Sequence, residues 1–171
     1  MSSARPFLHA LPSPIATLRL LATDDALVGV YLEGHGDQVP PVADGPPGDA
    51  AQAIFDAAAR WLDSYFAGQD RTPDVPLAAH GTAFQEAVWA ELARIPWATT
   101  ITYAALAARI GRPGASRAVG AANARNPLSL LVPCHRVVGA GGALTGYAGG
   151  LDAKRWLVEH EAHFAASDAR G

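Results

Sequence analysis

The pattern of hydrophobic and polar positions divides the chain into a strand-rich beginning and a mostly helical remainder. Two apolar, strand-like runs, residues 15–23 and 27–32, flank Asp24 and Asp25 and predict a hairpin. A Pro- and Gly-rich loop over residues 39–48 follows them. The next apolar residues recur at the spacing of a helix. They are Ile54, Phe55, Ala58, Trp61, Leu62, Tyr65 and Phe66. These elements predict a small α/β unit.

A connection between domains is expected next. The segment 68–81 contains Pro73 and Pro76 and no apolar periodicity, which is typical of a linker. A chain of 171 residues is long enough for two small domains. We therefore expect an N-terminal α/β domain over residues 1–78 and a C-terminal domain over residues 79–171.

The hydrophobic pattern after this linker predicts helices. Thr82 can cap the first of them, and Gln85 three residues later completes a capping box. The last helix is expected over residues 152–161, with Trp156 and Leu157 on its apolar side. The second part of the chain is therefore expected to be mostly helical.

Two short helices in the middle of this part resemble a helix-turn-helix. The first is expected from Thr102 to Ile110 and the second from Ser116 to about Ala124, with the turn 111–114 between them. In such a motif the second helix normally contacts DNA. Arg117 and Arg125 lie near its two ends. Helical hairpins also serve in plain packing, so the motif alone leaves both roles open.

Charge is unevenly distributed along the chain. The formal net charge is −3, but residues 1–80 carry −6 and residues 81–171 carry +3. No acidic residue occurs between Glu91 and Asp152. The arginines of that stretch are Arg94, Arg109, Arg112, Arg117, Arg125 and Arg136. A segment with arginines and no acid is suited to binding phosphate, although a solvated face with this charge by chance is an equal alternative.

The chain contains one cysteine, Cys134, between Pro133 and the pair His135 and Arg136. A thiol beside two potential cations is placed for thiolate chemistry. A lone cysteine in an apolar run is by default a buried structural residue. The extended backbone imposed before the proline and the Gly-rich segment 139–150 favour instead a reactive thiol in a close-fitting pocket.

Composition excludes several classes of protein. Half of the residues are hydrophobic and 17% are charged, which is typical of a globular protein. No apolar run is long enough to span a bilayer, and no signal-peptide pattern opens the chain, so no membrane contact is expected. One cysteine can form neither an internal disulfide nor a cysteine zinc cluster, so a reducing cytoplasm is the expected compartment. Neither a metal nor a cofactor is expected. The histidines interpreted as surface or packing residues are His9, His35, His80, His160 and His163.

The run from Pro133 to Val138 resembles the active-site signature of the methylated-DNA–protein-cysteine methyltransferases, also called O6-alkylguanine-DNA alkyltransferases. Other motifs of that family follow in its order over residues 81–161, and the match is looser before them. These motifs are Gly81-Thr82-x-Phe84-Gln85-x-x-Val88-Trp89, Thr102-Tyr103, Arg117-Ala118-Val119-Gly120, Asn126-Pro127, Gly146-Tyr147-x-Gly149-Gly150 and Lys154-x-Trp156-Leu157-x-x-His160-Glu161. The resemblance implies an α/β (α+β) fold. A small N-terminal ribonuclease-H-like α/β domain would precede a mostly helical C-terminal domain with a helix-turn-helix.

The resemblance implies transfer of an alkyl group from O6-alkylguanine, and from O4-alkylthymine, in DNA. Cys134 would be the nucleophile, and His135 would take its proton through a water while Glu161 orients the imidazole. Asn126 would hold the active-site turn, and Tyr103 would protonate the departing base at N3. Since nothing in the chain can break a thioether, transfer would be irreversible and occur once per molecule.

The resemblance also implies double-stranded DNA as the partner of a monomer, with the second helix of the motif in the minor groove. Arg117 would fill the gap left when the damaged nucleotide is flipped out. The other DNA contacts expected are Thr102, Ala118, Gly120, Arg125 and Arg136. The walls expected for the base pocket are Val137, Tyr147, Ala148 and Gly149.

Two other classes of protein remain open on the residues alone. A DNA-binding regulator could use Cys134 to sense electrophiles, and it would bind a specific sequence. A cysteine hydrolase would form an acyl-enzyme with small esters or peptides. Neither explains the ordered motifs from Thr82 to Glu161, so the alkyltransferase is the favoured interpretation.

Overall fold

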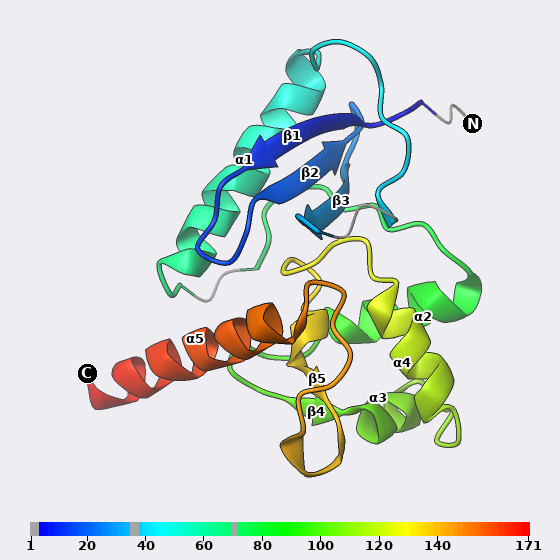
Figure 1. Ribbon diagram of the computed structural model, residues 1–171, viewed down its shortest axis with the longest axis vertical. Helices are drawn as coiled ribbons and strands as arrows, with labels where there is room; N and C mark the ends of the chain where they lie inside the picture. The colour runs from blue at the N-terminus through cyan, green and yellow to red at the C-terminus, as the bar shows by residue number, and fades with distance from the viewer. Residues whose placement is uncertain (1–3, 35–37, 70–71) are drawn as a thin grey trace. The chain divides into compact units, whose positions relative to one another are not determined.

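The computed structural model describes residues 4–34, 38–69 and 72–171, and the chain divides into two compact units, Met1–His80 and Gly81–Gly171 (Figure 1). Among the described residues, no helix combines the length and the apolar composition that crossing a membrane requires.

The N-terminal unit is an antiparallel sheet with one helix against it (Figure 1). Its strands are β1 (Phe7–Leu11), β2 (Leu18–Ala22) and β3 (Leu27–Leu32), in the order β1-β2-β3. The predicted hairpin is confirmed as β2 and β3, which pair from Leu18 opposite Leu32. Strand β1 was not predicted. It is a half-buried edge strand of five residues, and its pairing with β2 defines it more than its composition does.

Helix α1 (Asp49–Phe66) contacts all three strands. The predicted apolar side is confirmed at Ile54, Phe55, Ala58, Leu62 and Tyr65, which are buried. Their spacing of three and four residues places them on one face of the helix. The unit is therefore held together by apolar residues from the sheet and from one side of α1.

The C-terminal unit begins with α2 (Ala83–Leu92), and the predicted capping box is present. The Gln85 amide donates to the Thr82 hydroxyl at 3.2 Å, and the Thr82 amide donates to the Gln85 side chain at 3.0 Å. A glycine is required at position 81, just before the capping box, because a Cβ there would lie 2.6 Å from the ring of Trp89. The Trp89 indole in turn donates to the carbonyl of Ala122 at 2.8 Å. This contact docks α2 against α4.

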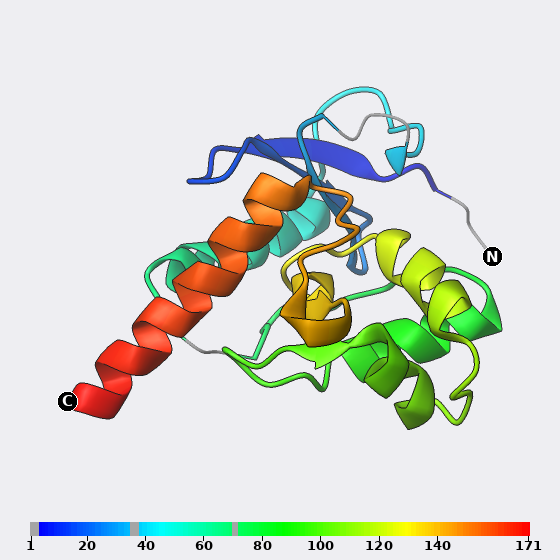
Figure 2. The ribbon, with the colours of Figure 1, turned by 60° about the horizontal axis from the view of Figure 1, so that its bottom comes forward.

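The helix-turn-helix consists of α3 (Tyr103–Arg109) and α4 (Ser116–Ala124), which pack against each other (Figure 2). Thr102 caps α3 by accepting from the amide of Ala105 at 3.1 Å. Just before α3, the short strand β4 (Ile101–Thr102) pairs in parallel with β5 (Val137–Val138). This pairing joins the helix-turn-helix to the segment that carries the cysteine.

Helix α5 (Leu151–Arg170) closes the chain and is longer than predicted (Figure 2). Its predicted end is Glu161, where the apolar periodicity stops. The following residues are rich in alanine, a strong helix former, and they continue the helix without being buried. Leu157 and Glu161 lie one turn apart on its buried side.

Candidate active site

The segment that carries Cys134 is a buried turn held by an asparagine. Asn126, two residues after the end of α4, donates from Nδ2 to the carbonyl of Val132 at 2.8 Å and accepts from the amide of Leu128 at 3.0 Å. Leu130 is buried with a left-handed φ of 71°. A branched residue in that region costs about 1–2 kcal/mol, and such strain is concentrated at functional sites. The turn leads into a 3-10 helix, Cys134–Arg136.

Cys134 is buried, with only 3% of the residue exposed. Burial raises its pKa above the ordinary value, while Asn126, Lys154 and Ser129 act in the opposite direction. Ser129 was not expected at the site, because a serine in an apolar run has no signal of its own. Since only the thiolate is a strong nucleophile, the buried thiol needs a base close by.

His135 and Glu161 form a buried pair. Nε2 of His135 lies 2.7 Å from Oε1 of Glu161, and neither side chain is more than 2% exposed. Burial lowers the pKa of His135, while its contact with Glu161 raises it. Burial alone would raise the pKa of Glu161, but the contacts with His135 and Arg136 bring it down to about 2. Glu161 is therefore a carboxylate throughout the physiological range of pH.

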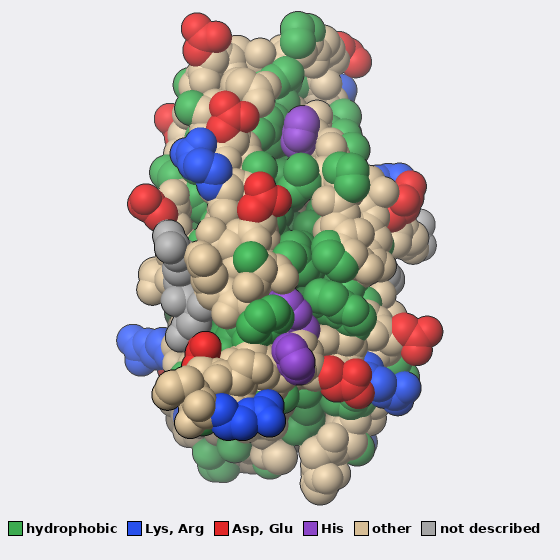
Figure 3. Space-filling model, turned by 90° about the vertical axis from the view of Figure 1, so that its left-hand side faces the viewer, with side chains coloured by type: hydrophobic (Ala, Val, Ile, Leu, Met, Phe, Trp, Pro, Cys, Tyr) green, Lys and Arg blue, Asp and Glu red, His purple; other side chains and the backbone are tan. Residues whose placement is uncertain are grey.

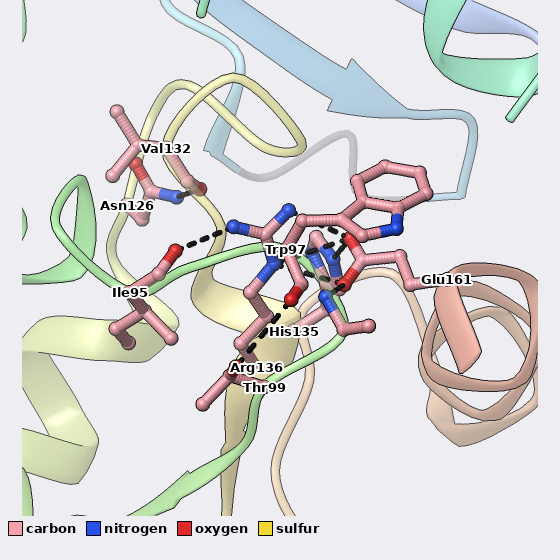
Figure 4. A network of polar contacts seen from close by, with 9 residues as sticks. Ile95, Trp97, Thr99, Asn126, Val132, His135, Arg136 and Glu161 are labelled. Atoms are coloured by element: carbon pink, nitrogen blue, oxygen red, sulfur yellow. Dashed lines mark hydrogen bonds and ion pairs between the residues drawn. The ribbon is translucent and has the colours of Figure 1, made fainter. Parts of the chain in front are cut away.

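Arg136 is part of the same network (Figure 4). Its Nη2 and Nε donate to the two oxygens of Glu161, each at 2.9 Å, and its Nη1 donates to the carbonyl of Ile95 at 2.6 Å. Arg136 as a whole is only 9% exposed. The guanidinium of Arg136 therefore faces inward in the free protein, although it was expected to contact DNA. It belongs to the segment with arginines and no acid, but α5 brings a carboxylate to it inside the unit.

Lys154 and Tyr103 both bind the loop that precedes α5. Nζ of Lys154, which is fully buried, donates to the carbonyl of Thr145 at 2.7 Å, and the hydroxyl of Tyr103 donates to the same carbonyl at 2.9 Å. Burial lowers the pKa of Lys154 and raises that of Tyr103. Lys154 had no predicted role. Its signal was available, because it is the single lysine among thirteen basic residues and lies one turn before the buried Leu157.

The residues expected to wall the base pocket differ in how far they are buried. The hydroxyl oxygen of Tyr147 is buried, and burial together with the nearby Cys134 thiol raises the pKa of Tyr147 well above its ordinary value. Ala148 and Gly149 are partly exposed. Val137 is fully buried in β5. Its side chain packs in the core of the unit in the free protein.

Helix α4 links an exposed surface to the nucleophile. Arg117, Ala118 and Arg125 are exposed, whereas Thr102 and Gly120 are partly exposed. On the buried side, Nδ2 of Asn123 donates to the carbonyl of Cys134 at 3.4 Å. Asn123 was missed by the sequence analysis because an asparagine within a helix is usually exposed.

No group of three or more His, Cys, Asp or Glu in the described part of the chain could hold a metal ion. The ring of His160 stacks on that of Trp156, with 4.7 Å between their centroids, and meets Phe164 edge-on. Figure 3 likewise shows histidine side chains among hydrophobic ones on one face of the molecule. His35 lies outside the described residues.

Family models match both parts of the chain. Residues 83–163 match the 6-O-methylguanine DNA methyltransferase DNA-binding domain, and residues 8–79 match the ribonuclease-like domain of the same family. A methylated-DNA–protein-cysteine methyltransferase of Methanosarcina acetivorans is 54% identical over 110 residues, which is 64% of this chain and 70% of that protein. A protein of the same name from Mycobacterium bovis is 50% identical over 67% of this chain and 69% of its own length.

Solved structures agree with these matches. The crystal structure of Mycobacterium tuberculosis OGT in complex with DNA is 39% identical, with a TM-score of 0.82 over 92% of this chain and 94% of that chain. A second structure, of the M. tuberculosis O6-methylguanine methyltransferase, has a TM-score of 0.78 at the same identity, over 92% of this chain and 93% of that chain. The expected fold class, a small α/β unit followed by a mostly helical one, is confirmed.

Proposed function

The chain belongs to the 6-O-methylguanine DNA methyltransferase family, and from this premise we propose that Cys134 is the residue that accepts the alkyl group. Members of this family repair DNA by transferring an alkyl group from O6-alkylguanine to their own cysteine, and this chain has a single cysteine. The observation that carries the assignment is the buried thiol next to the His135–Glu161 pair. In this pair, Nε2 of His135 lies 2.7 Å from Oε1 of Glu161.

The pair supplies the base that the buried thiol needs. Because the carboxylate oxygen of Glu161 accepts, Nε2 of His135 donates to it, and Nδ1 is the nitrogen that takes the thiol proton through a water. The S–H bond of Cys134 breaks as this proton leaves. The sulfur then attacks the alkyl carbon, a carbon–sulfur bond forms, and the bond from that carbon to O6 breaks. Its electron pair stays on the guanine.

The guanine anion needs a proton, and Tyr103 is placed to give it at N3. In the free protein the hydroxyl of Tyr103 donates to the carbonyl of Thr145, which Lys154 also binds. When Tyr103 turns to the base, Lys154 still holds that carbonyl. The loop that carries Tyr147, Ala148 and Gly149 thus stays in place around the flipped base.

The DNA-binding surface is the exposed side of α4. Arg117 enters the duplex where the damaged nucleotide has been flipped out, and Arg125 neutralises a phosphate. Thr102, Ala118 and Gly120 line the same surface, and their small side chains permit close approach of the backbone to the minor groove. The reported structure of the M. tuberculosis relative in complex with DNA supports DNA as the partner.

Three further features complete the proposal. O4-alkylthymine is a second substrate, since its alkyl carbon is attached through an analogous exocyclic oxygen. The protein acts as a monomer, with a repair domain that starts at residue 79. It works in the reducing cytoplasm, because the free thiol of Cys134 must stay reduced to react.

The mass of the intact protein tests this function. The full chain is mixed with a duplex that contains one O6-methylguanine, and a Cys134→Ser variant is treated in the same way. We expect the mass of one methyl group on the wild type, mapped to Cys134 and never exceeded with excess DNA. The variant should gain nothing. Absence of any gain by folded, reduced wild-type protein would exclude alkyl transfer, and continued turnover would exclude an irreversible one.

A further inference from the structure

We propose that Arg136 is a positioning residue that keeps His135 neutral by sharing Glu161 with it, so that the imidazole can accept the thiol proton. This inference rests on the proposed alkyl transfer to Cys134, and it assigns a task to a residue that does not itself touch the substrate.

Both oxygens of Glu161 are bound by the guanidinium (Figure 4). Oε1 accepts from Nε2 of His135 at 2.7 Å and from Nη2 of Arg136 at 2.9 Å. Oε2 accepts from Nε of Arg136 at 2.9 Å and from the amide of Ala98 at 3.1 Å. The imidazole therefore competes for a carboxylate that a permanent cation already occupies in the two-pronged geometry that arginine favours.

Arg136 is itself held so that it cannot turn away from Glu161. Its Nη1 donates to the carbonyl of Ile95 at 2.6 Å, and its guanidinium carbon lies 5.9 Å from the centre of the Trp97 ring. The side chain is anchored at both ends, since its backbone belongs to the 3-10 helix of the nucleophile. The charge next to Glu161 is thus a permanent part of the site.

The net charge of the cluster formed by His135, Glu161 and Arg136 decides whether the imidazole is neutral or protonated. A buried histidine paired with a carboxylate alone tends to become an imidazolium, because the pair is then neutral. An imidazolium has no lone pair with which to accept the proton of a thiol. With Arg136 present, the carboxylate is already neutralised, and a proton on His135 would leave a net positive charge in the interior.

Among the charged groups around His135, Glu161 alone favours the imidazolium. Burial is the largest influence lowering its pKa, Arg136 and Lys154 lower it further, and Glu161 alone raises it. The adjacent Cys134 thiol is protonated at rest, because burial raises its pKa. Tyr147, near the thiol, also keeps its proton. No anion other than Glu161 therefore faces His135 among these groups.

The test compares two substitutions of Arg136 in the full chain. Arg136→Gln removes the charge but keeps an amide that can donate to Glu161, and Arg136→Lys keeps the charge. Single-turnover methyl transfer from an O6-methylguanine duplex is measured from about pH 5 to about pH 9, the range over which a histidine titrates. We expect the acid limb of the rate profile to move up by about one pH unit in Arg136→Gln. It should stay near the wild-type position in Arg136→Lys.

A purely structural role for Arg136 gives a different result. Both variants would then be slower at every pH, with the acid limb unmoved, and this outcome would overturn the proposal. A shift of equal size in both variants would overturn it as well, because the charge would then not be the cause.

A second measurement is made on the wild-type protein and needs no substitution of Arg136. The ring nitrogens of His135 in the ¹⁵N-labelled wild type, assigned with a His135→Asn variant, report its protonation by NMR without DNA. We expect a neutral imidazole at neutral pH, and an imidazolium there would overturn the proposal. This result is separate from the proposed function, which fails only if the wild type takes up no methyl group.

Discussion

The two units of the chain bury different kinds of side chain. In the N-terminal unit the buried residues that the structure describes are hydrophobic. In the C-terminal unit the core also contains polar and charged side chains. They are Asn123, Asn126, Ser129, His135, Arg136, Lys154 and Glu161. Burying such groups costs free energy unless each is paired. The polar core of the C-terminal unit therefore has a cost in stability that the apolar core of the N-terminal unit does not have, and it is the polar core that surrounds Cys134.

Backbone conformation follows the same division. Among the described residues other than glycine, the two with a positive φ are Ala98, at 56°, and Leu130, at 71°. Ala98 donates its amide to Glu161, and Leu130 lies in the turn before Cys134. Strain of this kind persists only where the surrounding contacts impose it. It is therefore concentrated beside the buried polar groups.

The largest expected effect comes from Glu161→Gln. This change leaves the buried charge of Arg136 uncompensated and replaces the carboxylate that orients His135 by a neutral amide, whose NH2 group cannot accept from either partner. We expect a loss of about 3–5 kcal/mol in the free energy of unfolding and a fall of about 100-fold or more in the rate of methyl transfer. Urea unfolding and single-turnover kinetics measure the two quantities.

The matched substitution in the other unit is Leu62→Ala, on the buried side of α1. It should cost about 2–5 kcal/mol because it leaves a cavity in an apolar core. The rate of transfer per folded molecule should not change. If Leu62→Ala slows transfer as much as Glu161→Gln does, the functional division between the two units is wrong.

Acid should destabilise the C-terminal unit first. The pKa of Glu161 is lowered from 4.5 to about 2, so its stabilising contribution is present above about pH 4.5 and is lost as the pH falls towards 2. That contribution is on the order of 3 kcal/mol. The pKa of His135 is also lowered, from 6.5, so the unfolded state takes up that proton first and stability falls below that pH. Amide NMR spectra over a series of pH values follow the two units separately. Earlier loss of the N-terminal signals would contradict this expectation.

The smallest of these effects is expected for Lys154→Met. The thiolate loses a nearby cation, and the carbonyl of Thr145 loses one of its two donors. We expect methyl transfer to be slower by about tenfold, which corresponds to about 1.4 kcal/mol. The pH profile of Cys134 alkylation by iodoacetamide should move upward, because a cation that lowers the thiol pKa is gone. Arg155→Met, at the exposed neighbouring position of α5, is the control and should change neither quantity.

The elements that the sequence predicted best depend on neighbours close along the chain. The capping box joins Thr82 to Gln85, and the buried side of α1 repeats every three or four residues. Strand β1 was missed because its partner, β2, defines it, and the end of α5 was placed too early because its last turns are not buried. The hydrophobic pattern was not sufficient in either case. Pairing with β2 decides β1, and the helix propensity of alanine decides the end of α5.

The candidate site was predicted in part from the sequence. Cys134, His135 and Arg136 are adjacent, so a thiol with possible cations beside it could be recognised from the printed residues. The partner of Arg136 could not, because Glu161 lies 25 residues away on α5.

By itself, the sequence determined that one thiol stands beside an imidazole in an arginine-bearing segment without acids, and that short helices surround it. Only the tertiary structure decided that Arg136 faces inward onto Glu161, that Val137 lies in the core, and that Lys154 reaches the loop before α5. The physical reason is that a charge has no fixed role until its environment is known. The same guanidinium binds a phosphate at the surface and neutralises a carboxylate in the interior, and the packing of α5 selects between them.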